Sequence, residues 1–131
     1  MGPERKLYLK LKKYTPAIKW TRLENLSSLG TPDCLGYNNS GHYFTVELKV
    51  TKGKKIKFSP HQIAFHVEHP KNSYILIEDQ RQRSSKHFPW FLYHGAEVEK
   101  LVNQGLELEP WAWGLDPCSL ELVAWASKLD A

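Results

Sequence analysis

The chain opens with a segment whose apolar residues recur at helical spacing. Leu7, Leu11 and Tyr14 share one face at positions i, i+4 and i+7, which predicts a helix over residues 3–14. Leu7, Leu9 and Leu11 also alternate along the chain, so the same segment is compatible with a short strand. We take the helix as the prediction and the strand as its alternative.

Several later segments have the composition of strands and are separated by turn residues. They are residues 18–26, 32–37, 42–50, 73–79 and 88–93. The fourth of these segments is apolar at its centre, which predicts burial on both of its faces. Pro89 in the last segment indicates an edge strand, because proline cannot donate a hydrogen bond to a neighbouring strand.

The segment 42–50 alternates most regularly between polar and apolar residues. Glu47 and Lys49 share its polar face, and the opposite face carries only apolar residues: Phe44, Val46, Leu48 and Val50. The tetrapeptide NNSG at 38–41 precedes this strand and suits a hairpin turn, since asparagine and glycine accept positive φ. The pattern therefore predicts a half-buried strand that folds back on the preceding one.

Cap residues predict further helices. Ser59 and Pro60 fit the N-cap and first position of a helix that continues to about residue 69. Residues 97–104 form a shorter helix closed by the glycine that follows, and Asp116 begins a last helix of about a dozen residues. The resulting order, α-β-β-β-α-β-β-α-α, predicts an α/β fold with a mixed sheet and helices packed on it.

Length and composition fit one domain over residues 1–131, with its core over about 3–94 and a helical tail over about 97–131. The chain has 131 residues, of which 41% are hydrophobic and 24% charged. No apolar run approaches the roughly 18 residues that span a bilayer, and the N-terminus lacks the apolar core of a signal peptide. Cys34 and Cys118 are too few for a disulfide framework or a structural zinc site. We therefore expect a cytoplasmic protein without a membrane segment.

The chain has a net charge of +4, and many of its basic residues fall into three groups. One follows the 42–50 strand, one opens the chain, and one consists of Arg81, Arg83 and Lys86. Any one such group is commonly a solvated surface, but three of them around one acidic centre favour a phosphate-binding surface. The predicted nucleic-acid contacts are Lys52, Lys54, Lys55, Lys57, His61, Lys10, Lys12 and Lys13.

An acidic centre is predicted where two strands meet. Glu47 and Lys49 lie two residues apart on one strand face, roughly 7 Å along the strand. The hairpin brings Asp33 from the preceding strand beside Glu47, and Leu48 contributes its backbone carbonyl. Hard oxygen ligands of this kind suit Mg²⁺, which activates a bound water and neutralises charge on a phosphate. An amine beside the metal can orient or deprotonate that water.

These residues also carry a resemblance to a known family. The motifs Gly30-x-Pro32-Asp33, Glu47-x-Lys49 and Ser59-Pro60-x-Gln62, in this order, resemble the PD-(D/E)xK nuclease superfamily, and in particular its virus-type replication-repair nuclease branch and the Holliday-junction resolvases. The match covers residues 29–79, and the first helix extends it to residue 3.

The resemblance implies a restriction-endonuclease-like sheet of four to five strands flanked by helices, with an αβββαβ core. It implies that Asp33 and Glu47 bind Mg²⁺ or Mn²⁺, that Lys49 acts on the attacking water, and that Gln62 supports the site. Family members often carry another acidic residue on the first helix, for which Glu4 is the candidate and Glu24 its competitor.

Some residues have structural explanations as well. Gln62 also completes a capping box with Ser59, which alone would explain its presence. His61 and His66 are five residues apart, unlike the i, i+4 pair of a zinc helix, so we expect ordinary surface or core roles. Trp111, Trp113 and Trp125 could stack on bases. Packing in the core or at a subunit contact is the preferred interpretation.

A chain of this length has little room for a separate sequence-reading domain, which favours recognition of nucleic-acid backbone and shape. The resemblance therefore points to a structure-selective DNA endonuclease, similar to Holliday-junction resolvases of repair and recombination, acting on branched or duplex DNA. Symmetric cutting of a four-way junction needs two sites, so we expect a homodimer. Sequence-specific, nicking or RNA-cutting enzymes stay open, as do a non-cleaving nucleic-acid-binding module and a protein-interaction role.

Overall fold

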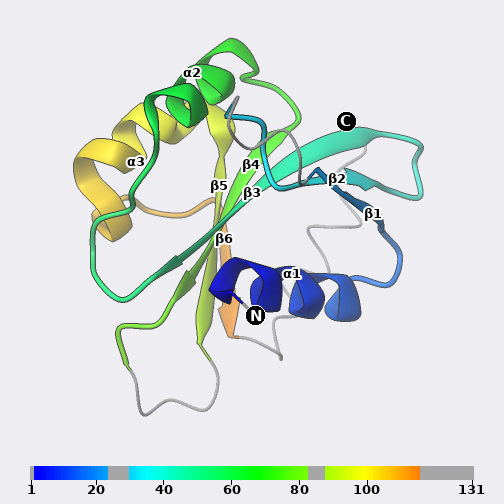
Figure 1. The fold of residues 1–131 in the computed structure, drawn as a ribbon, viewed down its shortest axis with the longest axis horizontal. Helices are drawn as coiled ribbons and strands as arrows, with labels where there is room; N and C mark the ends of the chain where they lie inside the picture. Colours follow the sequence, from blue (N-terminus) through cyan, green and yellow to red (C-terminus); the bar gives the residue numbers. More distant parts are fainter. Residues whose placement is uncertain (1, 24–29, 83–87, 116–131) are drawn as a thin grey trace.

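A mixed sheet runs through the molecule with its strands side by side in chain order (Figure 1). This computed structural model describes residues 2–23, 30–82 and 88–115. The strands are β1 (Lys19–Arg22), β2 (Cys34–Tyr37), β3 (Tyr43–Thr51), β4 (Ser73–Asp79), β5 (Pro89–His94) and β6 (Ala112–Leu115). The helices are α1 (Pro3–Tyr14), α2 (Pro60–Glu68) and α3 (Val98–Gln104), with short 3-10 turns η2 (Gly95–Glu97) and η3 (Gly105–Glu107) on either side of α3.

Neighbouring strands are antiparallel except for β3 and β4, which run parallel. A parallel pair needs a crossover connection, and α2 is that connection. The predicted α/β class is confirmed, and the order from α1 to β4 is the predicted α-β-β-β-α-β. The described strands number six, so the predicted four to five was wrong.

Two predictions about the end of the sheet were wrong. Residues 112–115 were placed in a helical tail but form β6 beside β5, because four residues are too short to show a strand period. β5 consequently lies between β4 and β6 and is not an edge. Pro89 is tolerated because it is the first residue of its strand, where a missing N–H matters least. The helix predicted to begin at Asp116 lies outside the described residues.

Each face of the sheet has its own apolar core. On one face, α1 packs against alternate residues of β3, β4 and β5: Leu7, Tyr8 and Leu11 contact a cluster with Phe44, Val46, Leu48, Tyr74, Leu76, Trp90 and Leu92. On the other face, α3 and the segment before α2 cover a second cluster that includes Ile56, Ile75, Ile77, Tyr93, Val98 and Leu101. β4 is buried along its whole length, as predicted, because both clusters use it.

The helical prediction for residues 3–14 is confirmed. Leu7 and Leu11 are buried, whereas Leu9 is 42% exposed, as a helix requires and a strand would not. The strand predicted over 18–26 is observed only over Lys19–Arg22, and residues 24–29 lie outside the described part of the chain. Within the described ranges, no helix has the length and apolar character needed to cross a membrane.

The exposed tryptophans do not fit a place in the core. Trp111 is 47% exposed and Trp113 is 57% exposed, so the core alternative is wrong for both. Trp111 packs beside Tyr74 and His94, with ring centroids 5.9 and 4.6 Å away. A subunit contact through them stays a prediction, and Trp125 lies outside the described residues.

Gly105 allows the chain after α3 to approach the loop that follows β3. Its φ is +59°, and a Cβ there would overlap the carbonyl oxygen of Lys54. Gly105→Ala is therefore expected to destabilise the fold by about 1–3 kcal/mol, through both strain and steric overlap. Gly53→Ala is the control, because a Cβ at Gly53 meets no atom within 4 Å. Thermal unfolding of both variants checks this; equal midpoints would contradict it.

Candidate functional site

Asp33 and Glu47 face each other across β2 and β3. The antiparallel register pairs Cys34 with Val46, so one residue further along Asp33 lies opposite Glu47. Asp33 Oδ2 accepts a hydrogen bond from the backbone N–H of Leu48 at 2.7 Å, which fixes its side chain beside β3. The structure therefore brings together the two acids that the sequence placed in one site.

Glu47 is a carboxyl group in an unfavourable electrostatic environment. Its side chain is on the α2 face of β3, and the residue is 3% exposed. The pKa of Glu47 is raised from its usual 4.5 to about 9, first by burial and then by the negative charge of Asp33 and a hydrogen bond with it. The ammonium of Lys49 lowers the pKa only in part. Without a cation, Glu47 is therefore protonated at neutral pH.

Gln62 connects Glu47 to Lys49. Its Nε2 donates to Glu47 Oε2 at 3.2 Å, and its Oε1 accepts from Lys49 Nζ at 3.0 Å. The same oxygen accepts from the backbone N–H of Ser59 at 3.0 Å, and the Ser59 side chain accepts from Gln62 N, so the predicted capping box is present. Gln62 therefore has both contacts that the sequence suggested. It completes the capping box, and its side-chain amide also bridges Glu47 and Lys49. Lys49 Nζ lies 4.7 Å from the centroid of the Phe58 ring.

Gly30 brings the segment before Asp33 against the start of α2. Its φ is +80°, and a Cβ there would overlap the backbone of His61. The motif glycine therefore has a steric role, since it lets the chain approach α2 before it reaches the buried Pro32 and the half-buried Asp33. His61 itself is exposed and does not line the groove described next, so the structure does not place it with the acids.

A groove of about 1300 Å³ opens at the acids. It is lined by α1, by the ends of β3 and β4 and by the loop after β3. Seven lysines contribute to the lining: Lys6, Lys10, Lys49, Lys52, Lys54, Lys55 and Lys57. The acids of the lining are fewer: Glu4, Asp33, Glu47 and Glu78. The groove therefore has an excess of positive charge around the carboxyl groups.

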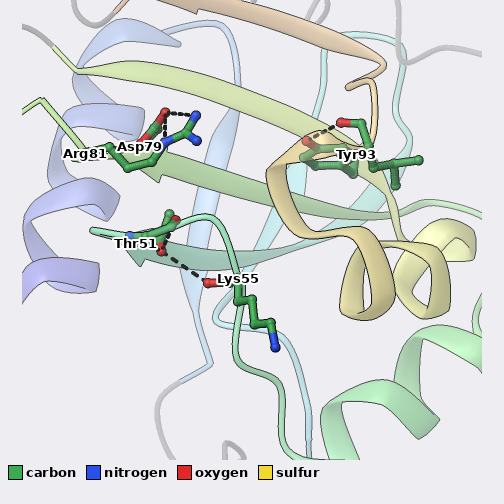
Figure 2. A network of polar contacts seen from close by, with 7 residues as sticks. Thr51, Lys55, Asp79, Arg81 and Tyr93 are labelled. Atoms are coloured by element: carbon green, nitrogen blue, oxygen red, sulfur yellow. Dashed lines mark hydrogen bonds and ion pairs between the residues drawn. The ribbon is translucent and has the colours of Figure 1, made fainter.

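The loop after β3 is held in place by hydrogen bonds from the Thr51 side chain and by contacts with the segment after α3. Thr51 Oγ1 lies 2.8 Å from the carbonyl oxygen of Gly53 and 3.3 Å from that of Lys55. Figure 2 shows Thr51 turned toward the backbone of Lys55, whose side chain extends away from it. On the far side of the loop, Leu106 N donates to Lys54 O at 2.9 Å, and Lys54 Nζ pairs with Glu107 at 2.7 Å. These contacts fix the backbone that carries the lysines.

The predicted lysines do not all reach the groove. Lys52, Lys55 and Lys57 line it and form no ion pair with the described residues. Lys12 and Lys13, in contrast, do not line it. Lys12 lies on another side of α1, and Lys13, one turn beyond Lys10, has its ammonium over the Tyr14 ring.

Two groove residues were not among the predicted site residues, although Lys6 belongs to the basic group that opens the chain. Lys6 lines the groove one turn before Lys10, and this i, i+4 spacing was the available signal. Glu78 is 2% exposed and accepts hydrogen bonds from Lys10 and from the Trp90 indole. An acid in an otherwise apolar strand was the signal for Glu78.

The arrangement fits a divalent cation. Glu47 Oε1 is buried and has no hydrogen-bond partner among the described residues. The N–H and C=O of an extended residue point to the same side of a strand, so the Leu48 carbonyl is directed toward Asp33, as its N–H is. Two carboxylates and a carbonyl are the hard oxygen donors that Mg²⁺ takes together with waters and phosphate oxygens.

The additional acid stays a prediction. Glu4 lines the groove, and its charge raises the pKa of Glu47, so α1 directs it toward the site. Among the residues that the structure describes, however, no three Asp, Glu, His or Cys side chains meet at metal-ligand spacing. Glu24, the competitor, lies outside those residues.

No protein-family model matches the chain, and none of the curated proteins matches it. A function for the protein therefore has to be inferred from Asp33, Glu47, Lys49 and Gln62 and from the groove around them.

The raised pKa of Glu47 predicts how stability depends on pH. A carboxyl whose folded-state pKa lies above its unfolded value stabilises fully below about pH 4.5, and this contribution is lost as the pH rises through about 9. Glu47→Gln keeps the shape without the ionisation. At pH 8 and without divalent metal, this variant should be more stable than the wild type by on the order of 1–3 kcal/mol.

Chemical denaturation from pH 4 to 9 measures this difference. Plotted against pH, the free energies of unfolding of wild type and Glu47→Gln should converge near pH 4. The control Glu99→Gln, at an exposed position on α3, should follow the wild type throughout. Parallel curves for wild type and Glu47→Gln would show that Glu47 ionises in the fold without cost.

Proposed function

We propose that the protein is a metal-dependent nuclease that hydrolyses DNA phosphodiester bonds. The observation that carries this proposal is the convergence of Asp33, Glu47 and the Gln62-linked amine of Lys49 in a groove lined by lysines. Acids alone would repel a phosphate diester, and lysines alone would only bind it. Together they fit a site that binds a polyanion and acts on one of its phosphates.

Each residue of this site has a distinct role in the proposal. A bound Mg²⁺ or Mn²⁺ supplies an acidified water and neutralises charge on the phosphate. Asp33 and Glu47 hold that cation, with the Leu48 carbonyl as a further donor. Lys49 stands beside them with its ammonium held by Gln62, where it orients the attacking water and stabilises the phosphate charge.

The same proposal includes a restriction-endonuclease-like core for the fold. A restriction-endonuclease-like core is supported by the order from α1 to β4 and by the parallel pairing of β3 and β4 through α2. In that arrangement the acids come from the β2–β3 pair and the supporting amide from the crossover helix.

Recognition of backbone and shape is the proposed mode of DNA binding. The groove lysines are suited to phosphates, and phosphate contacts carry no sequence information directly. We therefore propose a structure-selective endonuclease on branched or duplex DNA, acting as a homodimer where both strands of a junction are cut.

A substrate panel tests the activity. Four-way junction, linear duplex, single-stranded DNA and RNA are each incubated with the protein and Mg²⁺, Mn²⁺ or EDTA. We expect metal-dependent cleavage of DNA, with the branched substrate cut fastest, and no cleavage in EDTA. Binding of all four substrates without cleavage of any would indicate a non-cleaving module instead.

Two variants tie any cleavage to this site. Glu47→Ala and Lys49→Ala should each lower the cleavage rate by at least about 100-fold while DNA binding stays close to wild type. Glu99→Ala and Lys100→Ala, at exposed positions on α3, serve as matched controls and should cleave like the wild type. Loss of cleavage in the site variants alone, after identical purification, would exclude a contaminating nuclease. Cleavage that survives both site variants would show that the reaction takes place elsewhere.

The groove lysines should determine how DNA affinity depends on salt. Combined replacement of Lys52, Lys55 and Lys57 by Ala should reduce the slope of log K against log salt by about 1 for each lysine that contacts a phosphate. The Lys12→Ala/Lys13→Ala double variant removes basic residues outside the groove and should change the slope little. Fluorescence anisotropy at several salt concentrations measures both slopes; equal losses would place the DNA elsewhere.

A further inference from the structure

Three buried polar atoms without a hydrogen-bond partner among the described residues belong to α2 and the strand face beneath it. They are Thr45 Oγ1, Glu47 Oε1 and His66 Nε2. Native folds pair nearly all buried polar groups, with protein or with ordered water. Orphan atoms on adjacent elements, one of them on the central acid of the proposed site, therefore call for a common explanation.

The strand register and the helical spacing place these three atoms near one another. Thr45 and Glu47 point from the same face of β3, roughly 7 Å apart along the strand. Gln62 lies over Glu47, because its Nε2 donates to Glu47 Oε2 at 3.2 Å. His66 is one helical turn further, about 6 Å along the axis of α2. The two spacings match, so His66 lies over Thr45 as Gln62 lies over Glu47.

An independent contact confirms the position of His66. Its Nδ1 lies 2.7 Å from Ser73 Oγ, and Ser73 is the register partner of Thr45 in the parallel pair of β3 and β4. Adjacent partners lie about 4.8 Å apart in a sheet. With Nδ1 committed to Ser73, the opposite ring atom, Nε2, is left for the space above Thr45 and Glu47.

We propose that an ordered water molecule occupies this space and is held by Thr45 Oγ1 and His66 Nε2, from where it donates a hydrogen bond to Glu47 Oε1. Thr45 and His66 are then positioning residues: they act on Glu47 through the water and touch neither metal nor substrate. The existence of the water depends only on the fold, whereas its value for catalysis rests on the proposed function.

The hydrogen bonds of this arrangement are mutually consistent. Ser73 Oγ–H donates to Nδ1 of a neutral imidazole, and Nε2–H then donates to the water. The imidazole is neutral because burial lowers the pKa of His66 to about 4. The water also accepts from the Thr45 hydroxyl and donates to Glu47, which gives it the usual three partners of a buried water.

When a cation is bound and Glu47 is ionised, the consequence is a carboxylate held in one orientation. Gln62 donates to Oε2 and the water donates to Oε1, so rotation of the group would break a hydrogen bond at each oxygen. Each carboxylate oxygen keeps a second lone pair for a cation. Partners of this kind orient metal ligands, and their loss typically costs 10- to 100-fold in metal affinity or activity.

A crystal structure of the metal-free protein tests the water directly. At a resolution that shows ordered solvent, a water should lie about 2.7–3.2 Å from Thr45 Oγ1, His66 Nε2 and Glu47 Oε1. Thr45→Val, which keeps the shape and removes the hydroxyl, should lose it, and Thr45→Ser should keep it. Direct contacts among the three atoms, or an apolar dry gap between them, would overturn the proposal whatever the protein's activity.

Mn²⁺ titration and cleavage kinetics test the positioning role. Thr45→Val should bind Mn²⁺ about 10-fold more weakly and cleave with a lower kcat at unchanged KM for DNA, and Thr45→Ser should recover both. Thr45→Ala replaces Thr45→Val if the valine variant does not fold. A wild type without Mn²⁺ binding or cleavage would refute the proposed function but not the water. A wild type that binds and cleaves, with Thr45→Val equal to it, would refute the positioning role alone.

Discussion

The proximity of two carboxyl groups, one of them almost fully buried, is the constraint around which this molecule is organised. Glu47 has little solvent to stabilise its charge, and Asp33 opposite it makes ionisation still harder. A fold keeps such a pair only with a bound proton or a cation between the acids. The amide of Gln62, the ammonium of Lys49 and the N–H of Leu48 all lie where they support the charged form.

The topology explains how a short chain assembles this site. The β2–β3 hairpin sets Asp33 against Glu47 by backbone register, which no side-chain rearrangement can shift. The parallel β3–β4 pair requires a crossover, and that crossover places α2 over the polar face of β3. The opposite face of the same strand packs on α1 through apolar residues. One alternating strand thus serves the core on one side and the site on the other.

Much of this was accessible from the sequence because local rules decided it. The period of residues 3–14, the alternation of β3 and the Ser59–Pro60 cap each have one dominant physical cause, and all were predicted. The pairing of Asp33 with Glu47 followed from the hairpin. β6 and the interior position of β5 depend on contacts distant in sequence, which no local pattern encodes. The contacts of Glu78 could not be predicted for the same reason, since its partners come from α1 and β5.

The hydrogen bond and ion pair between Lys54 and η3 connect two parts of the chain that are distant in sequence. The backbone of Leu106 and the carboxylate of Glu107 hold the loop that carries the groove lysines, while Asp33 and Glu47 belong to the first half of the sequence. Under the proposed function, polyanion binding and phosphodiester cleavage would therefore be supported by different portions of the polypeptide. A substitution in η3 would loosen the loop that carries the lysines and leave Asp33 and Glu47 in place, so the two properties of the proposed nuclease could change independently.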